Sequence, residues 1–273
     1  MGSLGARGEV GAVKAAPAHQ LNAVGMKTLL VKEVRRFLRV PGQTVLSPLV
    51  STTLYFVVFG YTLSGRGHEI NGMPYSRFIV PGLIFLSLAN NSFLNSSSSL
   101  FITKIQGTVV DLLVAPLGPT EVLFGFIGGG MVRGLAVGLL TWGVAAVFTG
   151  FRLSHPLWTA AFLFIISYVF SILGFLAALW AEKFEQINFF PTFVMLPLTF
   201  LGGVFYSVRS LPQPWYRISL FNPIVYMVEG LRHGMLGKST LPPSVGIGIL
   251  AIVAVAATAV TVAALRSGYK LKA

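Results

Sequence analysis

The sequence predicts an all-α integral membrane protein with six transmembrane helices, an N-terminal amphipathic interface helix and a short re-entrant helical hairpin. Three observations support this prediction. The chain of 273 residues is 54% hydrophobic and only 10% charged, with a mean hydropathy of +0.77. A soluble domain usually has about 25% charged residues, so the charged side chains are too few to cover a water-facing surface. Apolar runs of about 20 residues, the length that crosses the hydrocarbon core, recur along the chain.

The expected spans are separated by polar or proline-containing connectors. Pro48 lies in the first span, and Pro191, Pro197 and Gly202-Gly203 interrupt the fifth. Such breaks are tolerated in lipid where other protein groups satisfy the freed backbone. The six expected spans, within a membrane domain of residues 44–266, cover residues 44–63, 78–101, 122–148, 156–181, 189–206 and 245–265.

The distribution of basic residues gives the expected orientation. The formal net charge is +12, and the even number of spans puts both termini on one side of the membrane. Because cytoplasmic segments concentrate Lys and Arg, both termini are expected in the cytoplasm. The loop from residue 207 to 244 argues against this, but long loops carry less weight. The basic residues are Arg7, Lys14, Lys27, Lys32, Arg35, Arg36 and Arg39 before the first span, Arg266, Lys270 and Lys272 after the last, and Arg209, Arg217, Arg232 and Lys238 in that loop.

The N-terminal region has two parts. Residues 1–25 are Gly- and Ala-rich and aperiodic, which indicates a disordered tail and not a signal peptide. Residues 26–40 predict an amphipathic helix in the membrane interface, ended by Pro41-Gly42. A surface anchor and a docking site for a partner protein are both consistent with this pattern. The expected apolar stripe is Leu30, Val34, Phe37 and Leu38, opposite Lys32, Arg35, Arg36 and Arg39.

The connector "KIQGTVVDLLVAPLGPTEV" (residues 104–122) is half polar and proline-broken between two long apolar runs. Residues 108–115 predict a short helix with Leu112 and Leu113 on its apolar side. Pro116 and the following Gly-Pro pair force a turn, after which Glu121 opens the next helix. A connector this apolar must be covered, either by its own bundle and the membrane surface or by another protein.

Polar and small residues within the expected spans need partners. Arg133, in the middle of the third span, must face protein or water, as a structural side chain or as a ligand for an anionic substrate group. Gly130 and Gly134 belong to a ladder of every fourth residue that allows close helix packing. Asn91 and Asn95 in the second span either line a polar seam or join helices by ordinary hydrogen bonds.

Residues 211–234 predict two short helices that dip into the outer leaflet, with a surface loop as the alternative. Prolines divide the segment, and it is rich in interfacial aromatic residues. Asn222 and Pro223 are expected to set the turn between the two helices. Glu229 and Arg232 have the i,i+3 spacing of a helical ion pair.

Six blocks in this order resemble the ABC-2-type export permease family, especially its YadH-like bacterial members. They cover most of residues 32–238 with similar spacing and read "EVRRF", "SRFIVPGLI", "DLLVAP", "GGGMVRGL", "PTFVMLPLTFLGGVFYS" and "LFNPIVYMVEGLRHGMLG".

The resemblance implies a half-transporter in the bacterial cytoplasmic (inner) membrane, surrounded by lipid. Two copies pair as a homodimer, and two separate ABC ATPase subunits bind ATP and Mg²⁺ below them. Residues 108–119 match the family's coupling helix, 26–39 its interface helix, and 211–234 its hairpin near the exit. The implied substrate is amphipathic: a drug, lipid, glycolipid or polysaccharide. The expected ATPase-coupling residues are Asp111, Leu112, Leu113, Pro116, Glu121, Arg35 and Arg36.

Other functions are disfavoured by what the sequence lacks. There is no cysteine, no metal-ligand spacing and no phosphate-binding loop, since Arg232 stands where Gly237-Lys238-Ser239 would need a glycine. We therefore expect no catalytic residue, cofactor or nucleic-acid partner in this chain. The alternative function is an ion- or proton-coupled carrier, but no carboxylate falls in the core of an expected span and no repeat is visible.

Overall fold

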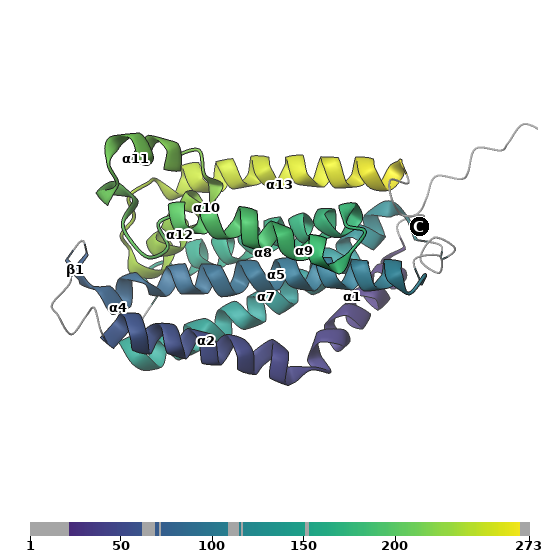
Figure 1. Ribbon diagram of the computed structural model, residues 1–273, viewed down its shortest axis with the longest axis horizontal. Helices are drawn as coiled ribbons and strands as arrows, with labels where there is room; N and C mark the ends of the chain where they lie inside the picture. The colour runs from purple at the N-terminus through teal and green to yellow at the C-terminus, as the bar shows by residue number, and fades with distance from the viewer. Residues whose placement is uncertain are drawn as a thin grey trace, which may run out of the picture.

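The computed structural model describes residues 22–61, 69–70, 72–108, 115, 117–150 and 153–267, and these form an elongated bundle of helices (Figure 1). Most helices run along the long axis of the molecule. α1 (Ala23–Leu38) and the end of α13 (Pro243–Arg266) lie at one end, which we call the α1 end. α11 (Gln213–Ser219) and β1 (Glu69–Ile70) lie at the other, the α11 end.

Four helices are long and apolar enough to cross a membrane. α4 (Tyr75–Phe78) continues into α5 (Val80–Ile105), and the other three are α7 (Pro119–Thr149), α8 (Pro156–Trp180) and α13. They correspond to the second, third, fourth and sixth expected spans, with ends that differ by a few residues. The prediction of a mostly helical membrane protein is therefore confirmed, with four candidate spans among the described residues.

The first and fifth expected spans are only partly helical and contain wider, π-helical turns: residues 202–206 of the fifth follow the last helical residue, Leu201, and residues 62–63 of the first lie outside the described residues. Pro48 and Pro197 contribute, because proline has no N–H for the hydrogen bond to the residue four positions earlier. The six-span count is thus not confirmed by helix length and hydropathy. The elements are η1 (Gly42–Leu46), α2 (Ser47–Tyr55) and η2 (Phe56–Tyr61) in the first segment, and α9 (Phe184–Phe190), η3 (Pro191–Met195) and α10 (Leu196–Leu201) in the second.

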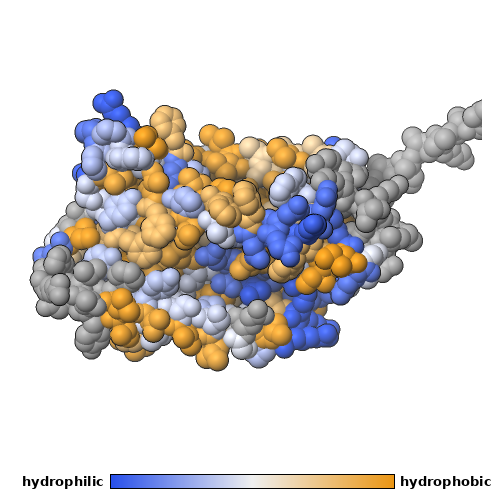
Figure 2. All heavy atoms as spheres, viewed as in Figure 1, coloured by the Kyte–Doolittle hydropathy of each residue, from blue (hydrophilic) through white to orange (hydrophobic). Residues whose placement is uncertain are grey.

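α5 is the central helix of the bundle. It packs against α7 and α8 along its length, and most of its residues are buried. Aromatic rings fix these contacts, with Phe85 and Phe170 centroids 5.8 Å apart and Phe93 stacked 5.1 Å from Phe190. α7 and α13 instead present large apolar side chains such as Val147 outward. Figure 2 shows a broad hydrophobic surface across the middle of one face, with hydrophilic residues gathered toward the two ends.

The expected glycine ladder lies where α7 meets α5. A Cβ atom added to Gly134 would overlap the Ser92 side chain, and one added to Gly130 would overlap Ser96. Both serines are fully buried. The glycines therefore allow the two helix backbones to approach more closely than any other residue would.

The α11 end is built from short elements. α12 (Pro223–Leu236) packs against α8, α13 and α5, and Val225, Val228 and Leu231 on it are fully buried. The segment expected as a hairpin thus forms two helices, and the second is part of the bundle. The remaining elements are β2 (Met73–Pro74), paired antiparallel with β1, and η4 (Val208–Ser210).

We expect Gly134→Ala to lower the free energy of unfolding by about 1–3 kcal/mol, because the new Cβ overpacks the contact with Ser92. The melting temperature of the detergent-solubilised protein should fall accordingly. Gly143→Ala is the matched control, since a Cβ at Gly143 on the same helix meets nothing within 4 Å. Equal melting temperatures for the two variants would contradict the close α5–α7 contact.

Candidate functional site

The α1 helix is docked on α7 through a face that differs from the predicted one. Its buried residues are Leu29, Glu33 and Phe37, one turn apart. A Cβ at Gly125 or Gly129 of α7 would overlap the side chains of Leu29 and Glu33, respectively. The helix also begins at Ala23, capped by the Asn22 side chain, three residues before the expected start. The predicted stripe thus identifies the helix, but its inward face includes a carboxylate.

Glu33 forms a buried polar joint with two neighbours. Its side chain is 1% exposed and accepts a hydrogen bond from Arg36 Nε at 3.2 Å. Arg36 also donates to the backbone oxygen and to Oδ1 of Asn95 on α5, both at 3.0 Å. The two arginines expected to serve ATPase coupling are therefore not equivalent. Arg36 ties α1 to α5, whereas Arg35 is exposed in a basic groove along α1.

Glu121 is a second joint at the same end. The side chain is 2% exposed and accepts hydrogen bonds from the Asn22 backbone N–H and the Thr120 hydroxyl, both at 3.0 Å. A carboxylate in the first turn of α7 also interacts favourably with the helix dipole. Glu121 thus connects the starts of α1 and α7. The other expected coupling residues, Asp111, Leu112, Leu113 and Pro116, lie outside the described residues.

Sequence reasoning assigned no role to Lys104 or Glu33. Lys104 Nζ, near the end of α5, donates to the backbone oxygens of Ala178, Leu179 and Ala181 at 2.9–3.0 Å, and so holds the last turn of α8. A lone cation just past a long apolar run is the signal for such a contact. For Glu33, the signal is its i,i+3 spacing from Arg36.

A lateral cavity of about 440 Å³ opens between α2, α5 and α10, with Arg133 of α7 in its wall. One part of the wall is polar and the other is apolar. Of the expected pathway residues, Asn91 and Arg133 line it, while Asn95 is buried in the joint with Arg36. Its lining residues are Ser47, Pro48, Ser51, Thr52, Tyr55, Leu83, Leu86, Ser87, Asn90, Asn91, Leu94, Arg133, Leu196, Thr199, Phe200 and Phe205.

Arg133 differs from the other buried cations because no described residue neutralises it. It makes no hydrogen bond or ion pair within the described part of the chain, and its Nε is buried without a partner there. Asn91 does not reach it by a hydrogen bond, since its Nδ2 donates to the Ser87 backbone oxygen at 2.9 Å.

Asn222 and Pro223, expected to set the turn of the hairpin, lie at the start of α12. Asn222 Oδ1 accepts from the Ile224 backbone N–H at 3.0 Å, which caps the helix, and Pro223 occupies the first helical position. The same Asn222 side chain donates to the Leu198 backbone oxygen at 2.6 Å. The turn before α12 is thereby attached to α10.

Glu229 and Arg232 form the expected ion pair, 2.7 Å apart and almost fully buried. Arg232 also donates to the backbone oxygens of Gly203 and Val204, and its guanidinium lies 4.0 Å from the centre of the Phe78 ring. Burial of an unpaired arginine would be costly, so this set of partners explains how α12 carries the charge into the bundle.

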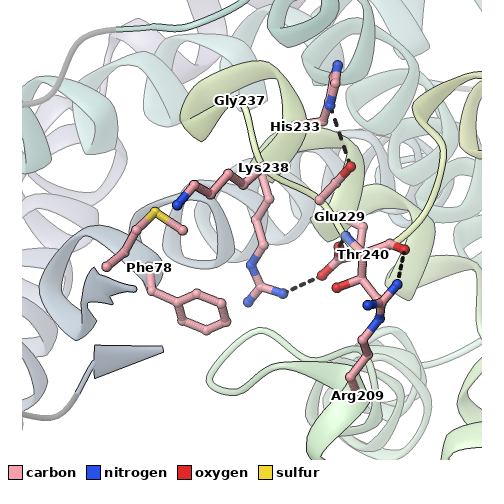
Figure 3. Close-up of a pocket in the computed structure, with 10 residues that line it drawn as sticks. Phe78, Arg209, Glu229, His233, Gly237, Lys238 and Thr240 are labelled. Atoms are coloured by element: carbon pink, nitrogen blue, oxygen red, sulfur yellow. Dashed lines mark hydrogen bonds and ion pairs between the residues drawn. The ribbon is translucent and has the colours of Figure 1, made fainter. Parts of the chain in front are cut away.

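Figure 3 shows the α12 pocket, a cavity of about 440 Å³ at the α11 end. Arg209 donates to the Thr240 backbone oxygen at 3.2 Å, beside Glu229. The Thr240 N–H in turn donates to Glu229. Because the polar groups of this pocket largely bind one another, the pocket functions as structural support for α12. Its lining residues are Met73, Phe78, Arg209, Glu229, Arg232, His233, Gly237, Lys238, Ser239 and Thr240.

Comparison with known proteins gives a consistent result. The model of the family described as ABC-2 type transporter matches residues 25–236. The inner membrane transport permease YadH of Escherichia coli (strain K12) is 40% identical over 233 residues, which cover 85% of this chain and 91% of that protein. Nodulation protein J of Rhizobium leguminosarum bv. viciae is 24% identical over 225 residues, which cover 82% of this chain and 86% of that protein.

We expect Arg36→Ala to destabilise the protein by about 3–5 kcal/mol, because it leaves the Glu33 carboxylate buried without its cation. Arg35→Ala removes the same charge from an exposed site one residue away and should leave the melting temperature unchanged. Thermal denaturation of the two variants in one detergent tests this, and equal losses would show that Glu33 does not depend on Arg36.

We expect Glu229→Gln to lower stability by a similar amount, about 3–5 kcal/mol, because Arg232 then remains buried without a counter-charge. Lys238→Gln removes an exposed charge from the same pocket and is the control. Unchanged thermal denaturation of Glu229→Gln would mean that the backbone oxygens alone stabilise Arg232.

Proposed function

The chain belongs to the ABC-2 type transporter family and is a non-catalytic membrane permease subunit that works with an ABC ATPase, and from this premise we propose that it is an exporter. It pairs with a second copy of itself and is driven by two ATPase subunits, which bind ATP and Mg²⁺. The relatives and the apolar helices identify it as a multi-pass protein of the bacterial inner membrane.

In the proposed topology the chain crosses the membrane six times. The helical segments 42–61 and 184–201 provide the other two crossings, in addition to the four long helices. The α1 end then faces the cytoplasm, which agrees with the three basic residues exposed on α1, Lys27, Lys32 and Arg35, and both chain termini are on that side. The α11–α12 segment dips into the outer leaflet.

The observation that carries the proposal is the set of joints at the α1 end. The expected coupling helix, residues 108–119, lies between α5 and α7 in the sequence, and α1 packs on α7. The Glu121–Asn22 and Glu33–Arg36–Asn95 contacts link these three helices. An ATPase that pushes on the connector therefore displaces α1, α5 and α7 together.

This displacement reaches the lateral cavity directly, because the helices that move also form part of its wall. α7 is one uninterrupted helix, and α5 and Arg133 of α7 both contribute to the cavity wall. ATP-driven movement of the α1 end would therefore change the spacing between α5 and the α2 and α10 helices. The wall combines apolar residues with polar side chains, which supports an amphipathic substrate: a drug, lipid, glycolipid or polysaccharide.

The double variant Asp111→Ala/Leu112→Ala tests the coupling. We expect ATPase co-purification and the ATPase activity of the vesicle-reconstituted complex to fall at least tenfold, because a central contact residue typically contributes about 2 kcal/mol or more to binding. Phe184→Ala/Glu185→Ala is the matched control, an apolar and an acidic residue exposed in the first turn of α9 at the same end.

Two results would contradict the proposal. Normal ATPase binding and activity in Asp111→Ala/Leu112→Ala would show that force enters elsewhere. Solute transport at full rate by the permease alone, driven by an ion gradient in vesicles without the ATPase, would identify a secondary carrier instead.

A further inference from the structure

The position of Arg133 requires an explanation that the helix packing does not give. It lies near the middle of α7, about 21 Å along the helix from Pro119 at 1.5 Å per residue. Arginine at this depth faces protein or water, pairs with other groups and marks a functional position by default. Arg133 faces the lateral cavity and has no hydrogen-bond or ion-pair partner within the described residues.

The helical segments expected to cross the membrane contain no carboxylate that could serve as its counter-ion. The chain has eight Asp and Glu residues, and none lies within residues 42–61, 80–105, 122–149, 156–180, 186–201 or 243–266. Glu33, which α1 brings to the same face of α7, is bonded to Arg36. A second copy of the chain carries the same helices, so pairing does not supply the missing charge either.

The cavity is suited to hold an anion that carries an apolar tail. Beside Arg133, Asn90 and Asn91 of α5 supply polar groups, while Leu196 and Phe200 of α10 form an apolar wall. Its volume of about 440 Å³ is in the range of small-molecule sites. A guanidinium can donate two parallel hydrogen bonds to phosphate or carboxylate, and these are stronger where water is scarce.

We propose that the lateral cavity selects amphipathic anions, with Arg133 binding a phosphate, carboxylate or sulfate head group and the α10 wall holding the tail. This rests on the proposed export function and adds the substrate class to it. The head group that enters neutralises a charge which the described residues leave without a partner. A zwitterionic or cationic head group of the same size cannot do this equally well.

Binding to the purified permease–ATPase complex tests the inference. Dodecyl phosphate, dodecyl phosphocholine and dodecyl trimethylammonium have the same tail and differ in head-group charge. Isothermal titration in a neutral detergent should show dodecyl phosphate binding at least about tenfold more tightly than the other two, as expected for charge-assisted hydrogen bonds. Inorganic phosphate alone should neither bind nor compete, because it lacks the tail.

Arg133→Gln should remove this preference, and Arg133→Lys should keep most of it. Arg266→Gln, an exposed cation at the end of α13, is the control and should behave as the wild type. The proposal is overturned if the wild type shows no preference, if Arg133→Gln keeps it, or if inorganic phosphate binds as tightly as dodecyl phosphate, which would indicate a site for soluble anions.

Thermal stability separates ligand binding from a structural role of Arg133. Without ligand, Arg133→Gln should melt at the same or a higher temperature, because it removes an unpaired charge, and dodecyl phosphate should stabilise the wild type but not the variant. A large drop in melting temperature for both Arg133→Gln and Arg133→Lys would overturn the proposal in favour of a structural arginine. These readouts need no ATP, so their outcome is independent of whether the complex exports.

Discussion

Close backbone contact along α7 is the constraint on which the rest of the structure depends. Within lipid, helices gain little from the hydrophobic effect when they associate, because the surrounding tails are as apolar as their side chains. α7 meets this constraint with two groups of glycines on adjacent turns. Gly125 and Gly129 receive α1, whereas Gly130 and Gly134 receive α5. One helix therefore sets the positions of both α1 and α5.

Three cations that are fully or partly buried follow a consistent rule. Each donates hydrogen bonds to backbone oxygens of another element: Lys104 to α8, Arg36 to α5 and Arg232 to the segment after α10. The two arginines also pair with a carboxylate one turn away on their own helix. The bonds to the backbone oxygens join elements that are far apart in sequence. Arg133 departs from the rule, and for that reason it points to a function that packing alone does not explain.

The sequence allowed much of this to be predicted. Apolar length located the four long helices, and i,i+3 spacing gave the Glu229–Arg232 pair. The inward face of α1 was missed, because amphipathic analysis assigns charged residues to the outside and cannot recognise that Glu33 is neutralised by Arg36 and received by Gly129. Lys104 was missed for a related reason, since its partners are backbone oxygens of α8 that have no signature in the sequence.

The π-helical turns occur in the two helices that flank the lateral cavity, at η1 and η2 around α2 and at η3 before α10. Each such segment winds the backbone less tightly than an α-helix does. If one of these segments tightened into α-helical geometry, the part of the same helix that follows it would rotate about the helix axis, while the helix itself stayed intact. The lining of the cavity could then be exchanged by rotation, polar side chains giving way to apolar ones, with hardly any change in the positions of the helix axes.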